Sequence, residues 1–198
     1  MCTGAALSRF GLFEGINEVL LSTTSRKREC NAAPIGVRVL NGRCTLRVFE
    51  GAKTLTNLLS TPYCVAHVSH DAMLFVRAAL SNLDDDEFEW LTFDDVELPV
   101  ISGCEAYVAL GCTQVSAAKN TTTFVLSPLD GRVLSTTPRA HNRGFSALIE
   151  ACVLATRYVV FHDPHMLEHI LELEAVAKRC GDARVKQAFE LLLELIGE

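Results

Sequence analysis

The composition of the chain shifts once, near Pro138, and this shift limits the possible folds more than any other feature of the sequence. Before Pro138, short runs rich in Val, Thr, Leu and Phe alternate with Gly, Pro and Asn, a pattern typical of strands joined by turns. After Pro138, apolar residues recur at helical spacing. We therefore expect an α+β chain with a mainly β domain over residues 1–138 and a helical domain over residues 139–198.

The clearest local signal in the first domain is the dipeptide Asn41-Gly42 between two apolar-alternating runs, which predicts a β-hairpin over residues 37–49. Further strands are expected at residues 16–24, 63–69, 105–117 and 121–126, short helices at 53–60 and 71–80, and a turn at 129–131. Six or so strands with two short helices indicate a small barrel or sandwich.

Three helices are expected in the second domain. The first runs from Asn142 to about Phe161, and the second begins at Asp163-Pro164 and ends at Gly181. The third begins at Asp182 and places its apolar residues on one face. The short link between the second and third helices predicts an antiparallel pair.

Charge and cysteine content narrow the class of protein. Eighteen Lys and Arg against 24 Asp and Glu give a net charge of −6, which disfavours nucleic acid and anionic membrane surfaces as partners. The eight cysteines are scattered and contain no Cys-x-x-Cys pair, so we expect buried free thiols in a reducing compartment and no metal site. No secretory signal or apolar stretch of membrane-spanning length is evident, so the expected protein is soluble and cytoplasmic.

Residues 84–97 contain eight carboxylates interleaved with Phe88, Trp90 and Phe93. A calcium-binding loop would need a glycine at its bend and a fixed ligand spacing, and the segment 84–97 has neither. We therefore interpret the segment as a solvated acidic loop. The histidines of the segment 162–169 are likewise interpreted as solvated side chains.

Arg143, Glu150 and Arg157 recur at intervals of seven on the otherwise apolar first helix of the second domain. Side chains at this spacing share one face. Two interpretations stay open: a buried Arg–Glu–Arg ion-pair ladder, or a guanidinium group that binds an anion such as a phosphate.

Two short segments of the first domain suggest a binding site. Gly51-Ala52-Lys53-Thr54 lacks the full phosphate-loop pattern, but a Lys and a Thr at a helix start offer an ammonium, a hydroxyl and N–H groups to an anion. Thr54 could instead only cap the helix. Pro34 and Gly36 are typical of a strand edge or a bulge. Such an edge could bind a flat ligand close to the backbone, or it could bind no ligand.

Taken together, these fragments resemble one family. The segments are NAAPIGV at 31–37, GAKTLTNL at 51–58, VSHD at 68–71 and NRGFSALIEACVLATR at 142–157. They resemble the mainly archaeal family called domain of unknown function 447. That family is similar to the FMN-binding split barrels, which include flavin reductases and pyridoxamine-phosphate oxidases. The resemblance implies a split β-barrel followed by a small C-terminal helical bundle, with FMN as the cofactor.

The resemblance also implies roles for particular residues. The strand segment Asn31, Ala33, Pro34, Ile35 and Gly36 would supply backbone contacts to the flavin ring. The ribityl phosphate would be held by the helix-start residues Lys53, Thr54 and Asn57. Asn142 and Arg157 would close the site together with a neighbouring subunit, because split-barrel flavin sites usually lie at the interface of a homodimer.

The reaction is left open by this resemblance, since the family has no assigned activity. A flavin supplies the redox chemistry itself, so a protein nucleophile or base is not required. One hypothesis is a flavin-dependent oxidoreductase of unknown donor and acceptor. The alternative is a non-enzymatic flavin carrier or sensor whose helical extension contacts a partner. Backbone contacts to a flat ring do not distinguish FMN from another flavin or a deazaflavin.

Overall fold

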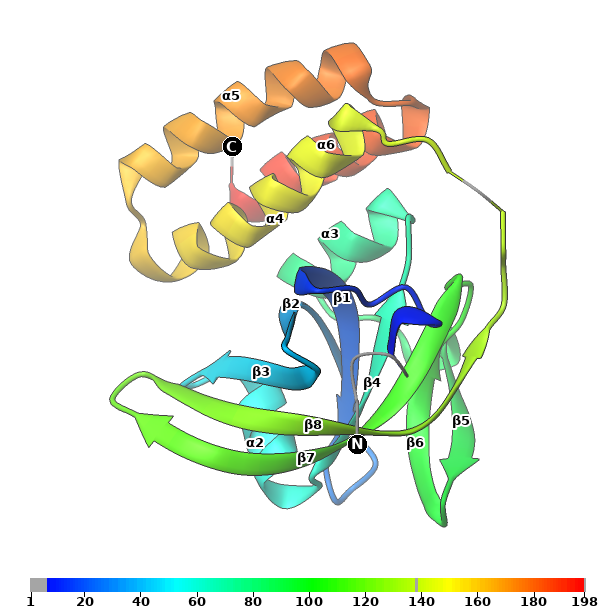
Figure 1. Cartoon of the computed structure of the whole chain (residues 1–198). Coiled ribbons are helices and arrows are strands. Elements are labelled where there is room, and N and C mark those ends of the chain that lie inside the picture. The colour runs from blue at the N-terminus through cyan, green and yellow to red at the C-terminus, as the bar shows by residue number, and fades with distance from the viewer. Residues whose placement is uncertain (1–6, 138, 198) are drawn as a thin grey trace. The chain divides into compact units, whose positions relative to one another are not determined.

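The computed structural model describes residues 7–137 and 139–197, and these form two compact units (Figure 1). The barrel unit contains the described residues up to Ser69 together with Asp84–Thr136. The helical unit contains His70–Leu83 and the described residues from Thr137 onward. The helical unit thus includes a segment that lies well before residue 138 in the sequence.

Six antiparallel strands close into a barrel in the order β1-β2-β3-β8-β7-β4 (Figure 1). The strands are β1 (Gly15–Thr24), β2 (Cys30–Leu40), β3 (Arg43–Phe49), β4 (Tyr63–Val68), β7 (Ala106–Ala118) and β8 (Thr121–Val133). Apolar side chains from alternate positions, among them Val37, Leu46 and Phe124, fill the interior. The barrel and the Asn41-Gly42 hairpin predicted from the sequence are confirmed.

The barrel opens between β2 and β3. These strands pair only where residues 37–40 of β2 face residues 43–46 of β3. From there β3 continues along β8, whereas residues 30–36 of β2 have β1 as their one strand neighbour within the described chain. One edge of this segment therefore presents backbone groups that no strand occupies, which also explains how Pro34 fits within a strand.

Helix α2 (Lys53–Ser60) follows β3 directly and matches the predicted helix at 53–60. Gly51, with a φ of +83°, makes the reversal between the two elements. Leu55 and Leu58 of α2 are buried in the barrel core, so packing fixes the position of the helix on the barrel.

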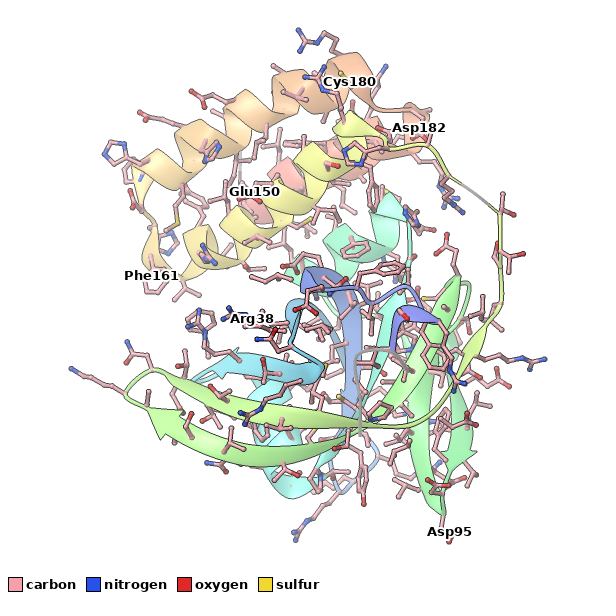
Figure 2. The ribbon with its side chains drawn as sticks, in the orientation of Figure 1. Arg38, Asp95, Glu150, Phe161, Cys180 and Asp182 are labelled. Carbon is pink, nitrogen blue, oxygen red and sulfur yellow. The ribbon has the colours of Figure 1, made fainter. Side chains whose placement is uncertain are left out.

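The prediction of a solvated acidic loop at 84–97 is wrong. A short 3₁₀ turn, η1 (Asp85–Glu87), leads into an antiparallel hairpin of β5 (Phe88–Phe93) and β6 (Val96–Ile101), with Asp95 at its tip (Figure 2). The turn residues Asp94 and Asp95 both have positive φ, as a two-residue hairpin turn of type I′ requires. Phe93, Leu98 and Val100 pack on Val65, Tyr107 and Ala109 to form a second core outside the barrel.

The predicted turn at 129–131 is also wrong, because β8 continues through these residues to Val133. A register shift between residues 108 and 110 of β7 accommodates these residues, and the β7–β8 pairing continues beyond it. Gly131 is needed for close approach rather than for a turn. A Cβ atom there would lie 2.5 Å from the Tyr107 carbonyl oxygen and 2.9 Å from the Phe10 ring.

The helical unit consists of α3 (Ala72–Leu80), α4 (Arg143–Phe161), α5 (Pro164–Cys180) and α6 (Ala183–Ile196). All four begin at a residue whose side chain accepts backbone N–H groups, namely Asp71, Asn142, Asp163 and Asp182. Their common core includes Val76, Leu148, Ile170 and Phe189. The three predicted C-terminal helices and the predicted helix at 71–80 are confirmed.

By length and composition alone, α4 is the one described helix that could cross a membrane. Its small residues Ala151 and Ala155 are buried in the core of the helical unit, where they allow α3, α5 and α6 to pack closely. The seven described cysteines are all free thiols, as predicted, and Cys2 lies outside the described residues.

His67 is a fully buried histidine that joins three strands. Its Nε2 accepts a hydrogen bond from the Ile101 N–H at 2.9 Å, so Nδ1 must bear the proton, which it donates to the Leu20 carbonyl at 3.0 Å. Burial lowers the pKa of His67 from 6.5 to about 4. The neutral ring therefore ties β4 to β1 and to β6.

This pKa predicts a stability loss in mild acid. Below pH 6.5 His67 becomes protonated in the unfolded chain, whereas in the folded chain it becomes protonated only near pH 4. The stabilisation is therefore complete above pH 6.5, and about 3 kcal/mol of it is lost as the pH falls to 4. Urea unfolding across this range should show His67→Gln less stable than wild type near neutrality but less sensitive to pH. The exposed control His169→Gln should keep the wild-type slope, and an equal slope in His67→Gln would contradict this assignment.

Candidate functional site

The open edge of β2 has one face made of small side chains. Ile35 packs against the barrel core, so by strand alternation Ala33 also faces inward, whereas Ala32, Pro34 and Gly36 face the other way. All residues from 30 to 36 are half-buried. A Cβ atom on Gly36 would lie 3.0 Å from both the Ile16 and the Glu18 side chains of β1. A flat ligand can approach this face closely at Ala32 and Pro34, because only small side chains project from the strand there.

Helix α2 is tied to the barrel by two hydrogen bonds between polar side chains. Asn31 Nδ2 of β2 donates to Thr54 Oγ1 at 3.2 Å, and Asn57 Nδ2 donates to Thr23 Oγ1 of β1 at 3.1 Å. Thr54 and Asn57 are 3% and 2% exposed. These bonds fix the first turn of α2 beside the start of β2.

The first turn of α2 leaves donors available to an anion. Ala52, the residue that caps the helix, makes no side-chain hydrogen bond, and the first turn contains no acidic residue. Within the described chain, the N–H groups of Lys53 and Thr54 donate to no partner, and the exposed Lys53 ammonium makes no ion pair. The positive end of the helix dipole adds to the attraction for an anion.

The structure therefore brings Asn31, Thr54 and Asn57 together and places Lys53 beside them. Pro34 lies further along the open edge. Thr23, the fully buried partner of Asn57, was not identified from the sequence. The run of buried hydroxyl residues at the end of β1 was the available signal, because hydroxyls buried in a strand need hydrogen-bond partners.

Asn142 and Arg157 belong to the helical unit. Asn142 caps α4, and its Oδ1 accepts the Phe145 N–H at 3.1 Å. Arg157 is exposed on the same helix. Because 15 residues separate them, they lie ~22 Å apart along the axis of α4. The two side chains therefore do not meet at one small group such as a single phosphate.

The ion-pair ladder considered for α4 is not formed. Arg143, Glu150 and Arg157 are all exposed, and none of them makes an ion pair with another described residue. Their spacing puts them on one exposed face of α4, where water solvates each charge. Arg157 is thus available to an anionic ligand. In the segment 162–169, the His165 imidazole lies 3.3 Å from the Glu168 carboxylate on an exposed surface.

A closed barrel with one opened edge is the architecture of the FMN-binding split barrels. An FMN-binding protein from Thermus thermophilus has this fold, with a TM-score of 0.51 and 13% identity, over 63% of this chain and 74% of its own. At that identity the likeness concerns the fold alone. The expected fold class, a split barrel with C-terminal helices, is confirmed.

The chain belongs to the DUF447 family. The model described as "Protein of unknown function (DUF447) N-terminal domain" matches residues 17–135, and the model described as "Protein of unknown function (DUF447)" matches residues 142–194. The uncharacterized protein MJ1453 of Methanocaldococcus jannaschii is 25% identical over 195 residues, which cover 90% of this chain and 96% of that protein.

A solved structure from the same family is similar along the whole chain. The FMN-bound protein MM1853 from Methanosarcina mazei is 34% identical to this chain and has a TM-score of 0.89. The match covers 96% of this chain and 99% of that one. Both the barrel and the C-terminal helices are therefore shared with a relative that was crystallised with FMN.

Proposed function

We propose that this protein binds FMN along the open edge of β2 and at the first turn of α2, and that it acts as a flavin-dependent oxidoreductase. The observation that supports the proposal most is the pairing of an unoccupied strand edge with uncapped helix amides beside Lys53. The strand edge can bind the polar edge of a flat ring, and the helix amides with Lys53 can bind a phosphate. The FMN-bound relative at 34% identity supports the same cofactor.

In this proposal the ring lies against the face made by Ala32, Pro34 and Gly36, and backbone groups of residues 31–36 bond its polar edge. Ala33 and Ile35 act through the backbone only, because their side chains face the barrel interior. The phosphate is held by the Lys53 ammonium and the first N–H groups of α2. Asn31 and Asn57 position α2 through their bonds to Thr54 and Thr23.

We further propose a soluble, cytoplasmic homodimer in which Asn142 or Arg157 of the neighbouring subunit closes the site. The exposed guanidinium of Arg157 suits an anionic group. The exposed apolar residues Val160 and Phe161 at the end of α4 offer surface for a protein contact; Figure 2 labels Phe161. Sedimentation of the purified protein tests the dimer.

FMN, when bound, supplies the capacity to accept and pass on a hydride or electrons. The contribution of the chain is to orient the ring and exclude water from one of its faces. Because the flavin itself would carry out the redox step, no acidic or basic side chain is required at the reacting atoms.

Anaerobic mixing of the FMN-loaded protein with NADH or NADPH tests the oxidoreductase. We expect the visible flavin absorbance to bleach at least about tenfold faster than that of free FMN, and to return on addition of an acceptor. The control is the same protein without a donor. Bound FMN that neither nicotinamide reduces faster than free FMN would favour the carrier or sensor instead.

A further inference from the structure

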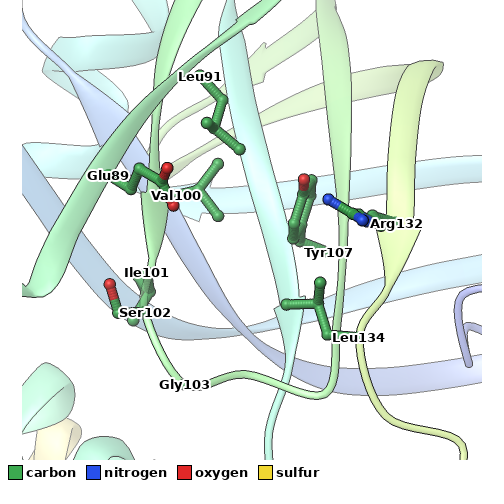
Figure 3. A pocket seen from close by; sticks show the side chains of 9 residues that line it. All are labelled: Glu89, Leu91, Val100, Ile101, Ser102, Gly103, Tyr107, Arg132 and Leu134. Atoms are coloured by element: carbon green, nitrogen blue, oxygen red, sulfur yellow. The ribbon is translucent and has the colours of Figure 1, made fainter.

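A second candidate binding site lies on the barrel unit, away from β2 and α2. It is a pocket of about 240 Å³ between the β5–β6 hairpin and the ends of β7 and β8 (Figure 3). Glu89 and Val100 line one wall, and Tyr107 and Arg132 line the other. Leu91 and Leu134 complete an apolar lining between them. The pocket shares no residue with the proposed FMN site.

Each wall of this pocket is a cross-strand pair. Glu89 stands opposite Val100 in the β5–β6 ladder, and Tyr107 stands opposite Arg132 in the β7–β8 ladder. Val100 and Tyr107 also belong to the second core, beneath the pocket. The separation of the walls is therefore set by packed side chains rather than by loops. The exit from β8 is fixed as well, because the Leu134 N–H donates to the Glu105 carbonyl at 2.7 Å.

Tyr107 has a buried ring and places its hydroxyl at the pocket, where solvent can reach it. Only 7% of the residue is exposed, and its ring is held by Phe93 and His67 at centroid distances of 6.1 and 6.4 Å. Its hydroxyl makes no hydrogen bond to any described residue, so it is accessible rather than buried, and it points toward the pocket beside the Arg132 guanidinium (Figure 3). Burial raises the pKa of Tyr107, so the hydroxyl keeps its proton and can donate it.

Opposite charges stand on the two walls. Neither Arg132 nor Glu89 makes an ion pair with a described residue, and both are exposed at the pocket rim. A simple anion at Arg132 would be repelled by Glu89 across the pocket and by Asp130, which like Glu89 acts on Tyr107. A simple cation at Glu89 would leave Arg132 without a partner. A ligand with both charges satisfies both walls.

We propose that this pocket binds a small zwitterion of the amino-acid class with an apolar side chain. Its carboxylate would accept from the Arg132 guanidinium and the Tyr107 hydroxyl, and its ammonium would donate to the Glu89 carboxylate. Its hydrocarbon side chain would contact Leu91, Val100 and Leu134. The proposal does not depend on FMN and concerns a ligand site separate from the redox centre.

Three probes with the same isobutyl group test the charge requirement: L-leucine, 4-methylpentanoate, which lacks the amine, and 3-methylbutylamine, which lacks the carboxylate. Titration followed by amide NMR should show saturable shifts at residues 102–107 with leucine. Each single-charge probe should bind at least about tenfold more weakly, because it loses a hydrogen bond between charged groups. Absence of saturable shifts with leucine, or equal binding of 4-methylpentanoate, would overturn the proposal.

Variants separate this site from a general surface effect. Arg132→Gln should weaken leucine binding at least about tenfold. Glu89→Gln should weaken leucine but strengthen 4-methylpentanoate, since it removes the repulsion of an anion. Arg47→Gln, an equivalent change at an exposed position of β3, should alter neither. A wild-type leucine affinity in Arg132→Gln would refute the assignment, and FMN binding measured in the same samples reports that each variant is folded.

Discussion

Replacement of Lys53 by glutamate is expected to weaken FMN binding at least about 100-fold while the barrel stays folded. The change removes a charge-assisted bond worth about 1.5 to 3 kcal/mol and adds repulsion of the phosphate. The fold should tolerate it because Lys53 is exposed and pairs with no described residue. An acidic residue is also favourable in the first turn of a helix. Equilibrium titration of FMN, followed by flavin fluorescence, measures the effect.

Riboflavin, which lacks the phosphate, sharpens this test. The affinity of Lys53→Glu for riboflavin should stay close to that of the wild type, because the ring contacts on β2 are unchanged. Lys119→Glu, the same charge reversal at the exposed β7–β8 turn, should bind FMN as the wild type does. An unchanged FMN affinity in Lys53→Glu, or an equal loss of FMN and riboflavin, would refute the phosphate site at α2.

Replacement of Gly144 by alanine is expected to destabilise the helical unit by about 3 kcal/mol. A Cβ atom at Gly144 would lie 2.3 Å from the Gly181 nitrogen and 2.4 Å from its Cα. Both are backbone atoms, so no side-chain rotation relieves the clash. The start of α4 would have to move away from the turn between α5 and α6. Loss of helical circular dichroism during urea unfolding measures the change.

The sign of this effect is diagnostic, because alanine in place of glycine normally stabilises an exposed helix by about 1 kcal/mol. Gly111→Ala in β7 provides a matched control, since a Cβ atom there meets its neighbours at 3.8 Å or more. That variant should change stability little. A Gly144→Ala protein as stable as the wild type would show that α4 and the α5–α6 turn do not approach so closely.

Local signals explain which parts of the fold could be predicted. Asn41-Gly42 and the four N-cap residues act through their own neighbours, so the hairpin and the helices follow from short segments. The β5–β6 hairpin was missed because its carboxylates, including Asp94 and Asp95 of its turn, resemble a solvated loop. Its apolar residues become a core only against β4 and β7, which are distant in the sequence.

In the candidate site, too, local features could be predicted from the sequence and contacts between distant segments could not. Pro34 and Gly36 indicated a strand edge open to a flat ligand, and the structure does leave that edge without a β3 partner. The bond from Asn57 to Thr23 could not be predicted, because it spans 34 residues and depends on how α2 packs on β1. For Arg143, Glu150 and Arg157, spacing indicated a shared face but not whether that face is buried or solvated.

FMN binding is best tested by the visible spectrum of freshly purified protein, followed by titration with FMN and mass identification of whatever denaturation releases. We expect a flavin spectrum, or saturable uptake of one FMN per chain, with FMN as the released compound. A colourless protein that also fails to bind added FMN would contradict it, and would leave the open edge of β2 and the free amides of α2 without a ligand.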